Sequence, residues 1–160
     1  MSNILANDVR TQYQKSFATI RGILDAFPEG KWFEPHGDAY YIPSRIAYHL
    51  AEFIDGAVAG GYQDPEFRNN LPFGPWKGAT AETLPGKREL IAYYEEAVAR
   101  ANKALESIDD DSVTAPIPPG GPPISETHLG LDLYIMRELA AHTGEMNKML
   151  IENGLEDIWM

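Results

Sequence analysis

RELAAHTGEMNKML, residues 137–150, combines helical spacing with polar residues where an amphipathic helix normally carries apolar ones. Steps of three and four residues connect this stretch to its neighbours and define one stripe that should face other helices. The stripe consists of Leu131, Ile135, Glu138, His142, Glu145 and Met149. Three of the six are ionisable, and a buried ionisable group needs a partner to offset its lost hydration. We therefore expect each of these three side chains to bind a metal ion or to pair with another polar group.

The rest of the chain predicts three further helices and no strands. Apolar residues at helical spacing cover residues 3–27, 43–61 and 86–108, and the opening stretch belongs to a fourth helix from 125 or 126 to 153. Pro43 suits a first helical turn, and Gly60 and Gly154 suit helix ends. The connections 62–84 and 109–123 are rich in proline and glycine, which favour irregular structure. We predict one all-α domain over residues 1–160, a four-helix bundle.

Composition excludes several classes of function. Hydrophobic residues make up 44% of the 160 residues and charged residues 23%, as in globular proteins. The net charge of −11, from 24 acidic and 13 basic residues, repels phosphate backbones and anionic lipid, so we expect neither nucleic acid nor a membrane as partner. The absence of cysteine excludes disulfides and thiolate ligands. Without a signal-like start or an apolar run of about 20 residues, we expect a cytoplasmic protein.

The histidines predict a metal site. Glu138 and His142 lie one helical turn apart, so their side chains are neighbours and can close on a single ion. A third ligand must come from another helix, and His49 lies on the otherwise apolar face of residues 43–61. Two imidazoles and a carboxylate suit Zn or Ni, with Mn and Fe(II) as further choices, and leave positions open for water or a small-molecule substrate.

Each of these residues also has a structural interpretation. His49 can be a core histidine bonded to a backbone carbonyl, and a Glu-x-x-x-His pair can be a surface ion pair. Glu145 either holds an imidazole in one tautomer or lies solvated near the end of the bundle. Glu52, close to one turn after His49, is expected on the surface. The two remaining histidines lie in or beside loops and are secondary candidates: His36 and His128.

Three motifs resemble those of the DinB/YfiT-like superfamily. AFPEGKWFEP (26–35) is similar to the segment that ends the family's first helix, PSRIAYHLAEF (43–53) to the histidine motif of its second helix, and ELAAHTGEM (138–146) to the histidine pair of its last helix. The similarity spans nearly the whole chain. It implies a bundle of up-down-down-up topology, frequent homodimers, and a divalent metal.

The resemblance carries the family's metal positions onto His49, Glu138 and His142. The chain departs from the pattern at 138, where the family usually has histidine, and at 145, where glutamate stands in place of the common glutamine. A carboxylate at 138 can still bind an ion, with altered metal preference, or mark a degraded site. Related members transfer bacillithiol or use mycothiol to isomerise maleylpyruvate, which implies a low-molecular-weight thiol as co-substrate.

Two functions of different classes follow. The first is a metal-dependent enzyme that acts on a small molecule by thiol S-transfer or hydrolysis, with Glu145 or Glu138 as catalytic base. The second is a non-catalytic, dimeric binding or stress-response bundle with a degraded site, in which His49 pairs with Glu138 without metal. The connection 62–84 is either a substrate cover or a cap on the core, through its residues Phe73, Pro75 and Trp76.

Overall fold

The structure is a computed structural model and describes residues 3–118 and 124–159. Four helices of eleven residues or more make up most of this part of the chain: α1 (Ile4–Ala26), α2 (Pro43–Phe53), α3 (Lys87–Glu106) and α5 (His128–Glu152). A five-residue helix, α4 (Asp110–Thr114), precedes α5, and a π-helical turn (Ile54–Val58) extends α2. Within the described residues the only extended pairing is an isolated bridge between Pro116 and Thr127. The all-α prediction is confirmed.

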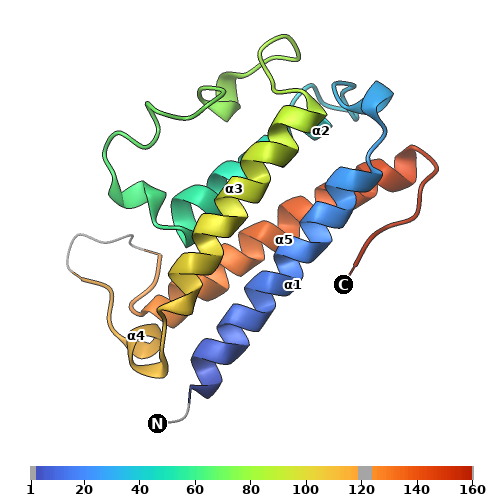
Figure 1. The fold of residues 1–160 in the computed structure, drawn as a ribbon. Helices are drawn as coiled ribbons and strands as arrows, with labels where there is room; N and C mark the ends of the chain where they lie inside the picture. Colours follow the sequence, from blue (N-terminus) through green and yellow to red (C-terminus); the bar gives the residue numbers. More distant parts are fainter. Residues whose placement is uncertain (1–2, 119–123, 160) are drawn as a thin grey trace.

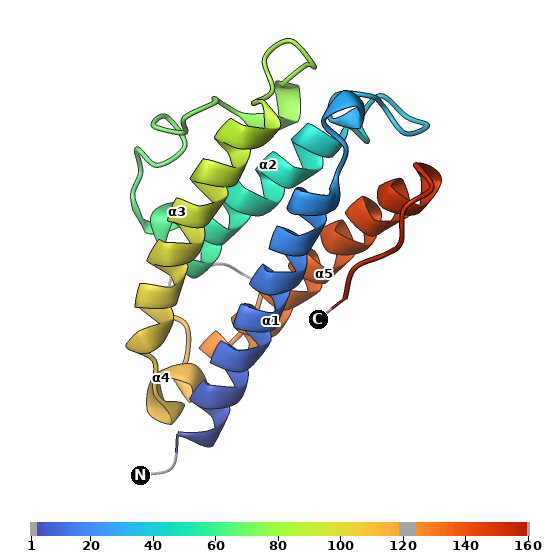
Figure 2. The same cartoon turned by 45° about the vertical axis from the view of Figure 1, so that its right-hand side comes forward.

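The four longer helices lie side by side. α1 packs against α3 and α5, and α2 packs against the same two helices. Figures 1 and 2 show α1 and α5 running away from the end of the molecule that carries α4, whereas α2 and α3 run toward it. Because α2 and α3 point the same way, the chain between them must return along their whole length. The long connection that the sequence predicts at 62–84 makes this return over the outside of the two helices (Figure 1).

Each longer helix buries one apolar face in a common core. The core includes Tyr13, Phe17, Ile20 and Leu24 from α1, Ile46 and Leu50 from α2, Leu90 and Tyr94 from α3, and Leu139, Met146 and Leu150 from α5. Buried hydroxyls find partners, since the Tyr94 hydroxyl donates to the carbonyl of Phe17 at 2.6 Å. None of the helices within residues 3–118 and 124–159 is long and apolar enough to cross a membrane.

The core face of α5 is rotated from the predicted stripe. Its buried residues are Ile135, Leu139, Thr143, Met146, Asn147, Met149 and Leu150. The prediction is confirmed for Ile135 and Met149, whereas Glu138 and Glu145 are half-buried and His142 is mostly enclosed beside the core face. The predicted stripe lies along one edge of the true face, about one position before the buried residues Leu139, Thr143 and Met146. Most side chains of the true face are apolar, because burying them costs no hydration of charge.

The segment after α3 is more regular than predicted. The prolines and glycines of 109–123 indicated irregular structure, yet residues 110–114 form α4. Asp109 caps this helix: its carboxylate accepts from the backbone N–H of Ser112 at 2.8 Å, and the Ser112 hydroxyl accepts from the backbone N–H of Asp109. The helix ends before Pro116, and residues 119–123 of the predicted loop lie outside the described residues. The predicted helix ends are confirmed, with Gly60 and Gly154 both at positive φ.

Candidate functional site

His49 of α2 and His142 of α5 lie against each other. Their ring centroids are 4.6 Å apart, and the ring planes cross at 81°. The two side chains are largely enclosed, with 13% of His49 and 16% of His142 exposed. The packing of α2 on α5 therefore unites two of the three residues that the sequence predicts as metal ligands, although they are 93 positions apart.

Each imidazole faces a carboxylate three residues further along its own helix. Nδ1 of His142 lies 2.7 Å from Oε2 of Glu145, and Nδ1 of His49 lies 3.8 Å from Oε2 of Glu52. A carboxylate only accepts, so Nδ1 of His142 is the donor to Glu145 and Nε2 is the ring nitrogen that remains for a ligand. Nδ1 of His49 is buried with no hydrogen-bond partner, and Glu52 is the carboxylate nearest to it along its own helix.

Glu52 is a buried residue, which corrects the prediction that it lies on the surface. Only 3% of it is exposed, and Oε1 accepts from the Tyr62 hydroxyl at 3.0 Å. Burial and then the charge of Glu52 raise the pKa of Tyr62, so this hydroxyl remains a donor. The Tyr62 ring reaches Glu52 by lying on Gly56, where an added Cβ would come within 2.2 Å of the ring. The connection between α2 and α3 thus helps to hold a carboxylate beside His49.

The aromatic residues Phe73 and Trp76 of this connection both pack against the core, as the cap on the core predicts. Trp76 stacks on His49, with ring centroids 3.9 Å apart and planes 25° from parallel. Phe73 instead packs edge-on against Tyr48 and Tyr93 and closes the core. The connection therefore caps the core through Phe73 and covers His49 through Trp76.

The third predicted ligand is not part of this pair. Oε1 of Glu138 lies 3.4 Å from Nη2 of its neighbour Arg137. Across residues 3–118 and 124–159, no three or more histidine, aspartate or glutamate side chains are grouped so that they could hold a metal ion. The structure thus brings together His49, His142 and Glu145, and it leaves Glu138 on the flank of α5.

The two secondary candidates lie apart from the histidine pair in different ways. His36 has its own carboxylate, since its Nδ1 lies 2.8 Å from Oε2 of Glu152 at the far end of α5. His128, the first residue of α5, lines a pocket that also reaches His49. His36 therefore links the loop before α2 to the end of α5, and His128 lines the same pocket as His49 without contacting it.

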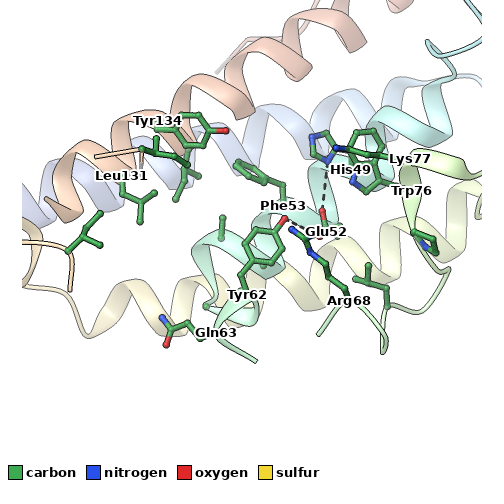
Figure 3. A pocket seen from close by; sticks show the side chains of 18 of the residues that line it. His49, Glu52, Phe53, Tyr62, Gln63, Arg68, Trp76, Lys77, Leu131 and Tyr134 are labelled. Atoms are coloured by element: carbon green, nitrogen blue, oxygen red, sulfur yellow. Dashed lines mark hydrogen bonds and ion pairs between the residues drawn. The ribbon is translucent and has the colours of Figure 1, made fainter. Parts of the chain in front are cut away.

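This pocket has a volume of about 900 Å³ and lies between α2, α5 and the connection after α2. Apolar side chains dominate its wall, and Figure 3 shows Phe53 and Leu131 on facing helices with Tyr62 beside them. His49 and Trp76 lie together at one end (Figure 3). A cavity of this size with a few polar groups at one end is typical of a small-molecule site.

No family model matches the chain, and no curated protein is significantly similar to it. The DinB/YfiT-like resemblance therefore stays a prediction that rests on the three motifs.

A repeated spacing in the sequence could have revealed the second carboxylate. His49-x-x-Glu52 on α2 and His142-x-x-Glu145 on α5 are the same i, i+3 pattern, and residues three apart are neighbours on a helix. The prediction instead paired His142 with Glu138, four residues earlier. Two matching pairs on two apolar helices are more informative than either alone, because each places a carboxylate beside a histidine that faces the bundle.

Proposed function

We propose that this chain is a divalent-metal enzyme that acts on a small molecule, by thiol S-transfer or hydrolysis, with the ion between α2 and α5. The observation that carries the proposal is the facing pair of imidazoles, of which His49 lies at the end of an apolar pocket. Nδ1 of His142 is 2.7 Å from a Glu145 oxygen, and Nδ1 of His49 is 3.8 Å from a Glu52 oxygen. Histidines that bind metals almost always donate the other ring N–H to such a partner.

The residues present fit an ion in chemistry and in spacing. With metal–nitrogen bonds of about 2.0–2.1 Å, two imidazoles on one ion have ring centroids roughly 5 Å apart, close to the observed 4.6 Å. The buried and unpartnered Nδ1 of His49 lies 3.8 Å from the Glu52 carboxylate, the kind of partner that orients a metal-binding imidazole. Zn or Ni suits the two nitrogens best, and Mn or Fe(II) is compatible with them.

The proposal gives each surrounding residue a task. His49 and His142 hold the ion through Nε2, and Glu138 joins them by turning away from Arg137, an exposed contact that costs little to break. Glu145 orients His142 through its contact with Nδ1, and it is the proposed base that accepts a proton from substrate or water. A bound ion would act as a Lewis acid, which lowers the pKa of water or stabilises a thiolate.

We also propose that the bundle is of the DinB/YfiT-like, up-down-down-up type. The parallel course of α2 and α3, opposite to α1 and α5, supports this topology (Figure 2). The three motifs lie where the resemblance requires them, at the end of α1, within α2 and within α5.

One observation favours a second function, a non-catalytic binding bundle. In the described part of the chain Glu138 pairs with Arg137, and no third ligand stands beside the two histidines. In that function the pocket binds its ligand without an ion, and the imidazole–carboxylate pairs only stabilise the junction of α2 with α5.

Titration calorimetry with Zn²⁺ and Ni²⁺ tests the proposal. Untagged protein is expected to bind about one ion per chain, and Glu52→Gln and Glu145→Gln are expected to weaken binding about 10–100-fold, because an amide holds the imidazole less firmly. Glu152→Gln, which alters the matching carboxylate at His36, serves as the control and should leave the affinity unchanged. Absence of binding in the wild type would favour the binding bundle.

A further inference from the structure

The charges on the pocket wall differ in sign from the protein as a whole. The chain carries a net charge of −11, yet Arg68 and Lys77 both line the pocket, and its one carboxylate is Glu52. The Glu52 carboxylate already has partners within the protein, because it accepts a hydrogen bond from the Tyr62 hydroxyl and faces His49. The pocket therefore offers two cations and no free anion to a ligand.

Neither cation has an acidic partner in the part of the chain that the structure describes. Among residues 3–118 and 124–159, no carboxylate oxygen lies within 4.0 Å of the charged nitrogens of Arg68 or Lys77. Each lies over an aromatic ring instead: the Arg68 guanidinium is 5.3 Å from the centroid of Tyr62, and the Lys77 ammonium is 5.6 Å from that of Trp76. These rings hold the two side chains at the pocket and leave their hydrogen-bond donors available. Figure 3 shows both side chains reaching from the connection toward α2.

The remaining wall is mostly apolar, with Gln63 and His128 among its polar residues. Phe53 on α2 and Leu131 and Ile135 on α5 form facing surfaces that bury hydrocarbon. Arg68 and Lys77 are both solvent-exposed, so their donors are accessible to a ligand in the pocket. A ligand that uses the whole pocket therefore needs an apolar body for the hydrocarbon wall and a negative group for the two cations.

We infer that the pocket binds a small organic acid, with its apolar body between α2 and α5 and its anionic group against Arg68 and Lys77. This inference names the substrate class of the proposed function and rests on it only in taking this pocket as the substrate site. Lys77 lies over Trp76, and Trp76 stacks on His49. A ligand whose acid group binds Lys77 therefore has the atoms next to that group close to His49.

A matched pair of fluorescent probes tests this inference without any metal. Anilinonaphthalene sulfonate carries an anionic group on an apolar body, and phenylnaphthylamine has the same body without the charge. With EDTA present, the full-length protein is expected to bind the anion more tightly than the neutral probe. The double variant Arg68→Gln/Lys77→Gln should weaken anion binding about tenfold or more and leave the neutral probe unchanged.

Lys103→Gln removes an exposed cation of α3 that does not line the pocket, and it should change neither affinity. Octanoate should displace the anionic probe from the wild type at lower concentration than octanol does. Equal affinity of the wild type for the two probes, or an equal loss of both in the double variant, would overturn the inference. Because EDTA removes free metal, these results do not depend on the calorimetry, and either proposal can fail alone.

Discussion

His49→Ala and His142→Ala are each expected to weaken Zn²⁺ or Ni²⁺ binding more than about 100-fold, which is more than about 2.7 kcal/mol. Each substitution removes one of the two nitrogens that the proposal assigns to the ion, so the loss should exceed that of the carboxylate variants. The two rings contact each other, and after either substitution only one imidazole remains at the proposed site. Titration calorimetry of the two variants beside the wild type measures the effect.

His36→Ala is the matched control for these variants. Its imidazole also pairs with a carboxylate through Nδ1, but that pair lies at the other end of α5. The His36→Ala variant should bind metal as tightly as the wild type does. An equal loss of metal affinity in all three variants would mean that the ions bind histidines anywhere on the protein and not at the proposed site. Circular dichroism should confirm that each variant keeps its helices.

Leu139→Ala is expected to lower the free energy of unfolding by about 2–5 kcal/mol. The side chain is fully buried, with 0% exposed, and lies in the core among the other apolar residues of the four longer helices. Truncation removes buried methyl groups and leaves a cavity that the helices fill only in part. Urea unfolding followed by circular dichroism gives the difference between variant and wild type.

Leu133→Ala provides the matched comparison on the same helix. Leu133 is 60% exposed, so the same truncation should change the free energy of unfolding by no more than about 0.5 kcal/mol. Similar losses for Leu139→Ala and Leu133→Ala would contradict the orientation of α5 and, with it, the placement of His142 beside His49.

The sequence predicted the helices well because their signals are local. Apolar spacing, Pro43 at a helix start and Gly154 after a helix end each act within a few residues. The short helix α4 was missed because its own signal, the Asp109 cap, lies among prolines and glycines that indicate a loop. Its cap hydrogen bonds to Ser112 override that local composition.

The site was predicted only in part, because its geometry depends on how the helices turn about their axes. The predicted core stripe of α5 lies one position away from its true face, so Glu138 was predicted in the core and the buried Leu139 was not. Residue spacing along the sequence does not predict contacts between distant segments. The stacking of Trp76 on His49 and the hydrogen bond from Tyr62 to Glu52 depend on the path of the long connection. Glu52 looked like a surface residue because the pattern of α2 alone does not show that this connection covers it.

The most direct test of the central claim is the nitrogen NMR spectrum of the histidine side chains during a titration with Zn²⁺. The chain has four histidines, so single variants assign every ring. Without metal, we expect His49 and His142 to carry the proton on Nδ1, and on titration both Nε2 signals should shift together and saturate at about one ion per chain. A proton on Nε2 of either ring, or saturation with His49 or His142 unshifted, would contradict a shared metal site between α2 and α5.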